Sequence, residues 1–425
     1  MTDVFCWRNK KMSGVRFSSL LPRLISRGTK WNSQHPMWVT QRLFASEADV
    51  DLTKTCLYDF HLEHGGKMVP FAGFSMPVQY KEGLLAEHLH TRNTVSLFDV
   101  SHMQQSKVYG KDRIQFIESL IVGDVAGLPD NTGTLSLFTN HKGGIQDDLI
   151  VSKTTEDYLY IVSNAGCIDK DIANMKAQEV AMKSQGFDVT FEPITDRALL
   201  ALQGPLMTKV LQNGIRSDLK DFTFMKTAEM SVYGVPNCRV TRCGYTGEDG
   251  VEISIPIKHV LEVVDSLMSC QLAEVKLAGL GARDSLRLEA GLCLYGNDID
   301  EDTTPIEATL AWTIAKRRRQ ESNFPGAEII LKQLKEKPKR KRVGIVSSGP
   351  PARAGTQILD ESGEPIGHLT SGCPSPTLKK NVAMGYVTTK HAKNGTKLKL
   401  QVRKKQIDAQ VCKMPFVPTK YYTGK

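Results

Sequence analysis

The chain has 425 residues, of which 40% are hydrophobic and 24% are charged, and its formal net charge is +9. This length predicts two or three domains, because a domain averages about 150 residues. The composition is typical of a soluble globular protein, and no apolar run reaches the roughly 18 residues of a membrane-spanning helix. The nine scattered cysteines form no CxxC pair, which argues against a disulfide framework and a cysteine-based zinc site.

The first 45 residues differ in composition from the rest of the chain. They contain one acid, Asp3, and interspersed serine and apolar residues, together with the basic residues Arg8, Lys10, Lys11, Arg16, Arg23, Arg27, Lys30 and Arg42. This Arg-rich, acid-poor pattern is typical of a mitochondrial presequence, and a disordered basic tail is the alternative. We therefore predict a presequence over residues 1–45, processing near Phe44, and a location in the mitochondrial matrix.

The chain up to about residue 330 mixes helices with strands. The spacing of apolar residues predicts helices at 82–95, 112–122, 169–184, 207–213, 259–268 and 281–290. Alternation between turns predicts strands at 106–109, 135–139, 145–152, 158–162, 188–191, 198–202, 230–233, 239–243 and 250–255. Short connections between the strands from 135 to 162 favour an antiparallel meander, so the class predicted for residues 46–330 is α+β.

Beyond residue 330 the helical patterns fade. A basic, hydrophilic stretch over 325–338 indicates a domain boundary, and short strands follow at 343–347, 357–359, 366–371, 383–386, 397–402 and 406–412. Short strands separated by Gly or Pro turns are typical of a small β-barrel or β-sandwich. We therefore predict a barrel-like domain over residues 331–425. The sequence has no Gly-rich phosphate loop and no dinucleotide fingerprint, so we expect no nucleotide cofactor.

Two adjacent carboxylates, Asp147 and Asp148, lie in a strand that leaves a Gly-Gly turn. Because side chains alternate along a strand, they should point to opposite sides. One can face solvent, and the other then faces inward, where a carboxylate must be paired, neutralised or used. Neighbours on opposite faces cannot share a proton, so a single pocket carboxylate fits better than an acid dyad. A polar hairpin start, with both carboxylates bonded to turn amides, is the alternative.

Two further segments carry candidate binding residues. Glu252 follows the glycine-containing turn at 244–250, and alternation places it opposite Val251 and Ile253. A carboxylate in such a position suits a flat ligand with adjacent N–H donors, and an exposed strand glutamate is the alternative. Arg283 and Arg287 lie one helical turn apart and can flank an acid, with a surface ion-pair lattice as the alternative.

The C-terminal segment 414–422 contains two prolines and three aromatic residues, although chain ends usually fray. A segment this apolar should dock onto the body of the protein, and docking could bring Tyr421 or Tyr422 near a site. Simple hydrophobic docking is the alternative. The paired histidines at 61/64 and 88/90 do not form a metal-binding pattern, so we expect hydrogen-bonded or solvated histidines and no metal.

Together these segments resemble one family. The stretches 143–148, 163–166, 200–205, 244–250 and 282–289 read GGIQDD, SNAG, LALQGP, GYTGEDG and ARDSLRLE. They are similar to the motifs of the T-proteins, the aminomethyltransferases of the glycine cleavage system. The similarity extends from about Leu57 to the C-terminal MPFVP.

This resemblance implies a three-domain cloverleaf around a central folate channel, with a β-barrel-like third domain. It also implies transfer of the methylene of the aminomethyl group on lipoyl H-protein to tetrahydrofolate. The products would be 5,10-methylenetetrahydrofolate, ammonia and dihydrolipoyl H-protein. Tetrahydrofolate is then a co-substrate, H-protein is a transient partner of a monomer, and neither metal nor nucleotide is needed. Basic clusters at 316–319 and 335–342 could steer an acidic H-protein, with solvated basic loops as the alternative.

The resemblance also assigns residues. The catalytic aspartate of the family corresponds to Asp148, whose charge can activate N5 of the folate and stabilise a developing iminium cation. The folate contacts correspond to Glu252, Arg283 and Tyr421. The channel positions correspond to Met103, Leu135, Val162, Asn164, Tyr245, Trp312 and Arg342.

Other functions fit the sequence less well. Folate-linked demethylating dehydrogenases need a flavin domain with a dinucleotide fingerprint, which is missing here. Non-catalytic folate-binding proteins that assist iron–sulfur assembly carry a K-G-C-Y-x-G-Q-E signature, whereas this chain has glycine after Cys243. They are the alternative function. Nucleic-acid binding is not expected, because the chain lacks a recognition motif and basic stripes interleaved with aromatic residues.

Overall fold

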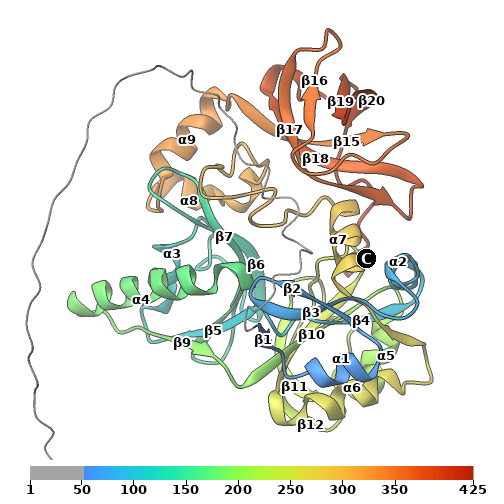
Figure 1. Ribbon diagram of the computed structural model, residues 1–425. Coiled ribbons are helices and arrows are strands. Elements are labelled where there is room, and N and C mark those ends of the chain that lie inside the picture. Colours follow the sequence, from blue (N-terminus) through green and yellow to red (C-terminus); the bar gives the residue numbers. More distant parts are fainter. Residues whose placement is uncertain (1–51, 425) are drawn as a thin grey trace, which may run out of the picture. The chain divides into compact units, whose positions relative to one another are not determined.

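The computed structural model describes residues 52–424, and the predicted presequence over residues 1–45 lies outside them. A mixed sheet in the order β11-β12-β13-β10-β4-β14 carries the main hydrophobic core (Figure 1). β4 runs parallel to β14, and the other neighbours are antiparallel. The strands of this sheet are β4 (Val95–Asp99), β10 (Arg197–Gln203), β11 (Thr227–Val232), β12 (Val235–Thr241), β13 (Gly250–Pro256) and β14 (Val275–Leu277).

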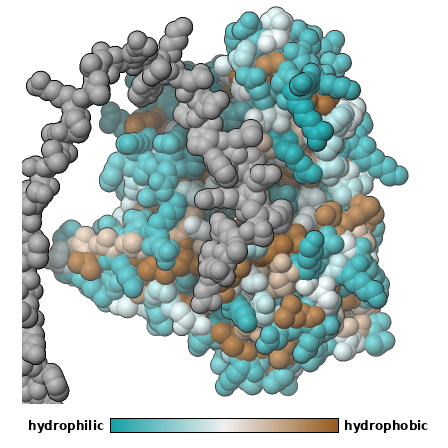
Figure 2. All heavy atoms as spheres, in the orientation of Figure 1, coloured by the Kyte–Doolittle hydropathy of each residue, from teal (hydrophilic) through white to brown (hydrophobic). Residues whose placement is uncertain are grey.

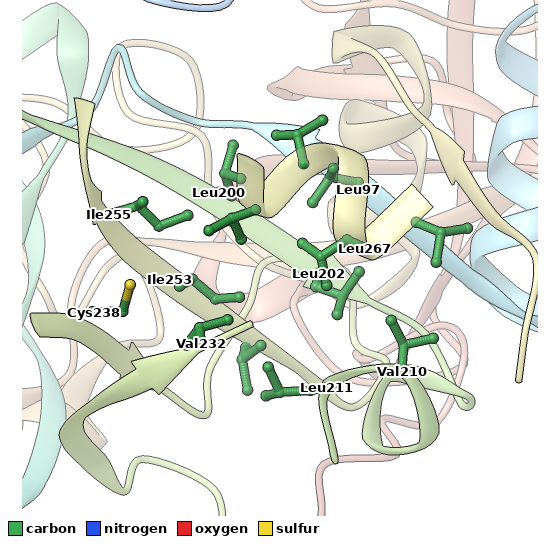
Figure 3. Close-up of a cluster of buried hydrophobic side chains, with 14 of the residues drawn as sticks. Leu97, Leu200, Leu202, Val210, Leu211, Val232, Cys238, Ile253, Ile255 and Leu267 are labelled. Carbon is green, nitrogen blue, oxygen red and sulfur yellow. The ribbon is translucent and has the colours of Figure 1, made fainter. Parts of the chain in front are cut away.

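Helices pack on one face of this sheet, where every second residue of its strands contributes an apolar side chain to the main core. They are α1 (Tyr58–Glu63), α5 (Met207–Gly214) and α6 (Val260–Met268). The buried residues of α6 recur at i, i+3, i+4 and i+7, which is the spacing of an amphipathic helix. Figure 3 shows side chains of α5 and α6 beside those of the strands, with labels on Leu97, Leu200, Leu202, Val210, Leu211, Ile253, Ile255 and Leu267.

A second sheet, in the order β6-β7-β8-β5-β9, is antiparallel throughout. Its strands are β5 (Gln104–Tyr109), β6 (Thr132–Thr139), β7 (Ile145–Lys153), β8 (Tyr158–Ser163) and β9 (Thr190–Ile194). The helices α3 (Arg113–Glu118) and α4 (Ile168–Ser184) pack against it through Phe116, Ile117, Met175 and Met182. The predicted antiparallel meander is confirmed, because β6, β7 and β8 are consecutive in both the chain and the sheet.

The C-terminal strands close into a barrel in the order β15-β18-β17-β16-β19-β20. They are β15 (Arg340–Ser347), β16 (Gln357–Leu359), β17 (Pro365–Ser375), β18 (Lys380–Thr388), β19 (Lys397–Val402) and β20 (Lys405–Cys412). Glycine is required at position 367, where β17 pairs with β18, because a Cβ there would lie 1.8 Å from the carbonyl oxygen of Tyr386. The predicted α+β class with a C-terminal barrel is confirmed.

Several elements were not predicted from the sequence. The N-terminal strands β1 (Thr53–Lys54), β2 (Lys67–Phe71) and β3 (Phe74–Gln79) form a small sheet of their own. Beyond α7 (Leu280–Glu289) lie α8 (Lys316–Glu321) and α9 (Ala327–Glu336). Four short 3-10 helices complete the described residues: Ala165–Cys167, Ile257–His259, Ala311–Thr313 and Thr389–His391.

No helix was predicted over 325–338, but α9 occupies most of this stretch. Ile330 is fully buried in a cluster with Leu137 and Ile145 of the second sheet, so this amphipathic helix belongs to the core. In the basic cluster 316–319, Arg318 is fully buried and donates to the carbonyl oxygens of Glu118 and Ile121. The proposed division of the chain after residue 330 falls inside α9 and stays a prediction.

The helix α2 (Leu84–Asn93) confirms the predicted helix at 82–95 but buries its polar side chains. Glu87 accepts hydrogen bonds from the backbone of Tyr80 and Gly279, and His88 bonds Ser285. The exposed residues of α2 include Leu84, Leu85 and Leu89. Figure 2 shows brown, apolar spheres where Figure 1 draws this helix.

Candidate functional site

A cavity of about 1200 Å³ opens between the two large sheets, α7, the loop that follows it, and the barrel. Every site residue predicted from the sequence lines this cavity: Met103, Leu135, Asp148, Val162, Asn164, Tyr245, Glu252, Arg283, Trp312, Arg342 and Tyr421. The structure therefore brings together residues that are up to 318 positions apart in the chain, since Met103 and Tyr421 are at the two ends of that range. Their roles stay predictions.

Asp148 lies in β7 and faces the cavity. Its Oδ1 and its carbonyl oxygen both accept from Nδ2 of Asn164, each at 3.0 Å. Burial and the adjacent charge of Asp147 raise the pKa of Asp148 to about 7, against the opposing effects of Asn164 and the positive Arg283. This carboxyl can therefore exchange a proton near neutral pH, which suits a general base.

Asp147 points to the opposite side of β7, as alternation predicts. Asp147 is fully buried, so it is not a carboxylate that faces solvent. Asp147 instead contacts Asp171 of α4, and burial raises the pKa of both carboxyls. Asp147 and Asp148 do not form an acid dyad, but the sequence did not indicate that Asp147 has a different acidic neighbour.

Glu252 comes to the cavity from β13 because of the same alternation. Its neighbours Val251 and Ile253 are fully buried in the main core on the other face of the sheet. Burial raises the pKa of Glu252, while the positive Arg283 and a hydrogen bond from the Cys243 thiol oppose that shift. A carboxylate at the cavity wall can accept two N–H donors from a planar ligand.

The two arginines of α7 have different surroundings. Arg287 is buried and bonds Asp298 at 2.6 Å and Asp284 at 2.8 Å, so it holds the loop after α7 to the helix. Arg283 faces the cavity, with its guanidinium 4.4 Å from the ring centroid of Tyr245. Within residues 52–424 no acid forms an ion pair with Arg283, so its donors can bind an acceptor on a ligand.

The C-terminal tail docks onto the body, as predicted. The backbone N–H of Phe416 donates to Glu289, and that of Phe224 donates to the carbonyl oxygen of Tyr422. Tyr421 stacks on Phe224, with ring centroids 4.3 Å apart and an interplanar angle of 14°. The stacked pair presents an aromatic wall to the cavity, against which a planar ligand can pack.

The surroundings of two predicted channel residues, Arg342 and Trp312, limit the contacts that each can make with a ligand. Arg342 donates to the carbonyl oxygens of Ala308 and Gly291, so its guanidinium is largely occupied. Trp312 lies at the rim with 63% of its surface exposed. We therefore expect Arg342 to shape the wall and Trp312 to contact a ligand only near the mouth.

Some cavity residues were missed by the sequence analysis. His102 is buried between Phe71 and Phe74 near the tip of the β2–β3 hairpin, and burial lowers its pKa to about 3. Its two ring nitrogens lack hydrogen-bond partners in the described part of the chain. The turn at Ala72 and Gly73, where φ is positive in both residues, brings the hairpin to the wall. No family motif or spacing marked this hairpin.

Within residues 52–424, no group of three or more His, Cys, Asp or Glu side chains could hold a metal ion. No helix of the same residues has the length and apolar character needed to span a membrane.

Comparison with known proteins identifies the family. A model for the GCVT N-terminal domain matches residues 57–318, and one for the glycine cleavage T-protein C-terminal barrel domain matches residues 340–418. The chain belongs to the glycine cleavage T-protein family. It acts as an aminomethyltransferase, which is a transferase, and the alternative of a non-catalytic folate-binding protein is not favoured.

Individual relatives agree with this assignment. The chain is 59% identical to a mitochondrial aminomethyltransferase of Mus musculus, over 91% of this chain and 95% of the mouse protein. It is 53% identical to the one from Solanum tuberosum, over 90% and 94% of the two chains. The crystal structure of the glycine cleavage system aminomethyltransferase T from Bartonella henselae superposes with a TM-score of 0.82 at 39% identity. It covers 88% of this chain and all of that one. The names of the mouse and Solanum tuberosum relatives support a mitochondrial location.

Proposed function

We propose that this T-protein accepts the aminomethyl group carried on lipoyl H-protein and transfers its methylene to tetrahydrofolate in the mitochondrial matrix. The methylene loses its bonds to sulfur and to the amino nitrogen, and it gains bonds to N5 and N10 of the folate. The two protons released from N5 and N10 go to the amine and to the sulfur. The products are then 5,10-methylenetetrahydrofolate, ammonia and dihydrolipoyl H-protein.

The chemical step depends on Asp148 in this proposal. As a carboxylate, it accepts the proton of N5 and stabilises the positive charge that develops as ammonia departs. The place of Asp148 on the cavity wall carries this role, and a pKa raised to about 7 lets the same group take and return a proton at neutral pH. Asn164 supports the role by donating to the Asp148 carboxylate and limiting its rotation.

The folate is held, in this proposal, by Glu252, Arg283 and Tyr421. Glu252 accepts the adjacent N–H donors of the pterin, Arg283 donates to an acceptor of the same ring system, and Tyr421 packs against a flat face. The cavity supports a site for two substrates, because about 1200 Å³ exceeds the roughly 300–1,000 Å³ of an ordinary ligand pocket. The lipoyl arm can therefore enter beside the folate.

A contact with an acidic H-protein needs accessible positive charge at the cavity mouth. Arg317 is a poor candidate, because it is paired with Glu118, Asp124 and Glu321. Lys341 and Lys413 are better candidates, since both are exposed and line the cavity. We expect charge removal at these lysines to raise the KM for H-protein at low salt and to have a smaller effect at high salt.

Replacement of Asp148 with Asn tests the proposed mechanism. Aminomethylated lipoyl H-protein and tetrahydrofolate are supplied together, and methylenetetrahydrofolate and ammonia are followed in parallel. We expect Asp148→Asn to lower kcat by about 10²- to 10⁴-fold, the usual contribution of a general base, with folate binding retained. Asp157→Asn, in the exposed turn after β7, is the matched control and should be active. Turnover of Asp148→Asn near the wild-type rate would exclude Asp148 from the chemical step.

A further inference from the structure

A second pair of carboxyls lies behind the strand that carries Asp148. Asp147 of β7 and Asp171, in the first turn of α4, are 0% and 1% exposed. Their carboxyls contact each other. Burial raises the pKa of both, Asp147 raises the pKa of Asp171 further, and a hydrogen bond from Asp171 partly opposes the shift of Asp147. Two buried carboxylates in contact cannot both be ionised, so such a pair holds one proton between its oxygens.

The hydrogen bonds around the pair indicate which carboxyl carries the proton. Asp147 accepts from the backbone N–H of Asn164 at 3.0 Å and from its Nδ2 at 2.9 Å, so it is surrounded by donors and suited to a negative charge. Oδ2 of Asp171 is buried without an N–H or O–H partner among residues 52–424. A proton held by Asp171 and shared with Asp147 fits these contacts, and the pKa of Asp171, raised to about 9 by burial and by Asp147, agrees.

One side chain links this pair to the cavity. Nδ2 of Asn164, which donates to Asp147, also donates to Oδ1 and to the carbonyl oxygen of Asp148, each at 3.0 Å. An amide nitrogen has two hydrogens and these are three acceptors, so the orientation of the amide depends on all of them. A substitution or a change of protonation at the Asp147–Asp171 pair can therefore alter the orientation of the Asn164 amide and, through it, that of the Asp148 carboxylate.

Other polar groups among the described residues surround the pair, and none of them is an acid or a base that would remove the shared proton. Lys170 precedes Asp171 but donates to the hydroxyl of Tyr295 and to Glu301. The thiol of Cys167 stays protonated, because burial and Asp147 raise its pKa. The hydroxyl of Ser163 also contacts Asp171 and favours its ionised form, but burial and Asp147 have the larger effect on the pKa of Asp171. On the cavity side, Asp148 faces Arg283 and the hydroxyl of Tyr245.

We propose that Asp171 is a positioning residue for the transferase reaction. The proton that it shares with Asp147 fixes Asn164 and, through that amide, the direction of the Asp148 carboxylate. This inference rests on the catalytic role proposed for Asp148. A purely structural role predicts instead that substitutions of Asp171 change the stability of the protein and leave kcat of the folded enzyme unchanged.

Two substitutions of Asp171 separate these roles. Asp171→Asn keeps an N–H donor for Asp147 and an acceptor for Ser163, so we expect a kcat close to that of the wild type. Asp171→Leu removes the donor, and we expect kcat to fall by about 10- to 100-fold with little change in the KM for tetrahydrofolate, as for other groups that orient a catalytic residue. Asp169→Asn, exposed in the same turn of α4, is the matched control.

The pH profile adds a readout that a structural role would not change. Asp147→Asn removes the negative charge that raises the pKa of Asp148, so the acidic limb of the kcat profile should move to lower pH. Asp171→Asn leaves Asp147 charged and should leave that limb in place. Equal kcat values for Asp171→Asn and Asp171→Leu in folded enzyme, or an acidic limb that Asp147→Asn does not move, would overturn the proposal.

The shared proton can also be detected without turnover. Infrared difference spectra of wild type against Asp171→Asn at pH 8 should contain the C=O stretch of one protonated carboxyl, which the substitution removes. This measurement decides the case if Asp171→Leu does not fold, and the lack of that band would refute the shared proton. If Asp148→Asn retains turnover, the mechanism proposed above fails, whereas the infrared result for the Asp147–Asp171 pair is independent of it.

Discussion

Glu252→Gln tests whether the cavity recognises a planar ligand through a carboxylate. In the wild type both carboxylate oxygens can accept N–H donors at a wall where burial already disfavours the charge. Glutamine keeps one acceptor and turns the other position into an N–H₂ donor, which would face a donor of the ligand. One charge-assisted hydrogen bond is lost and one buried donor is left without a partner.

The expected cost follows from these two changes. A hydrogen bond to a charged group contributes about 1.5–3 kcal/mol, and an unsatisfied buried donor costs a similar amount, with overlap between the two. A net loss of about 2–3 kcal/mol corresponds to a Kd for tetrahydrofolate raised about 30- to 140-fold, at 1.4 kcal/mol for each factor of ten. Isothermal titration calorimetry under anaerobic conditions measures this Kd directly.

The same substitution should stabilise the protein without ligand. Folding raises the pKa of Glu252, so the ionised carboxylate is destabilising above the pKa of the unfolded chain. Removing that charge should raise the Tm at pH 8 while folate affinity falls, and the gain should shrink at acidic pH. Glu192→Gln, exposed on β9, is the control. An unchanged Kd for tetrahydrofolate in Glu252→Gln would refute the assignment of Glu252 to the ligand.

Three further outcomes follow from the structure. Because the base form of Asp148 predominates above its pKa of about 7, kcat/KM should rise with pH through that value, and a flat profile from pH 5.5 to 8.5 would contradict this. Arg287→Met leaves Asp298 buried and unpaired at a cost of about 3–5 kcal/mol, measured as a lower Tm by calorimetry, and an unchanged Tm would show that the pair is dispensable. Ile330→Ala creates a cavity under α9 and should lower the free energy of unfolding by about 2–5 kcal/mol in urea, whereas a loss below about 1 kcal/mol would mean that α9 packs loosely.

The elements that could be predicted from the sequence have local patterns that match their burial. The barrel strands are short segments separated by turns that contain Gly or Pro. Each strand predicted between residues 343 and 412 overlaps an observed strand. Helix α2 was predicted as a helix, but its buried side is polar, because Glu87 and His88 satisfy groups on distant segments. Helix α9 was not predicted, because the segment is mostly basic and hydrophilic and only a narrow apolar stripe of it contacts β6 and β7.

In the candidate site, too, features that depend on neighbouring residues could be predicted, and features that depend on distant contacts could not. Alternation along β7 predicted that Asp147 and Asp148 point to opposite sides, and the family resemblance selected Asp148. Alternation along β13 placed Glu252 opposite its apolar neighbours, since that depends only on adjacent residues. The difference between Arg283 and Arg287 could not be predicted in this way, because both are one turn apart on the same helix. Asp298, 11 residues beyond Arg287, determines that Arg287 is a structural residue.

By itself, the sequence determined the family motifs, the strand alternation and the two carboxylates that reach the cavity. Only the tertiary structure decided which partners those residues have. Asp171 is 24 positions from Asp147, yet the two side chains meet behind the strand that carries Asp148. His102 has no motif around it, yet it lines the cavity. The pKa of a buried group depends on the charges and donors around it in space, and local sequence does not specify those neighbours.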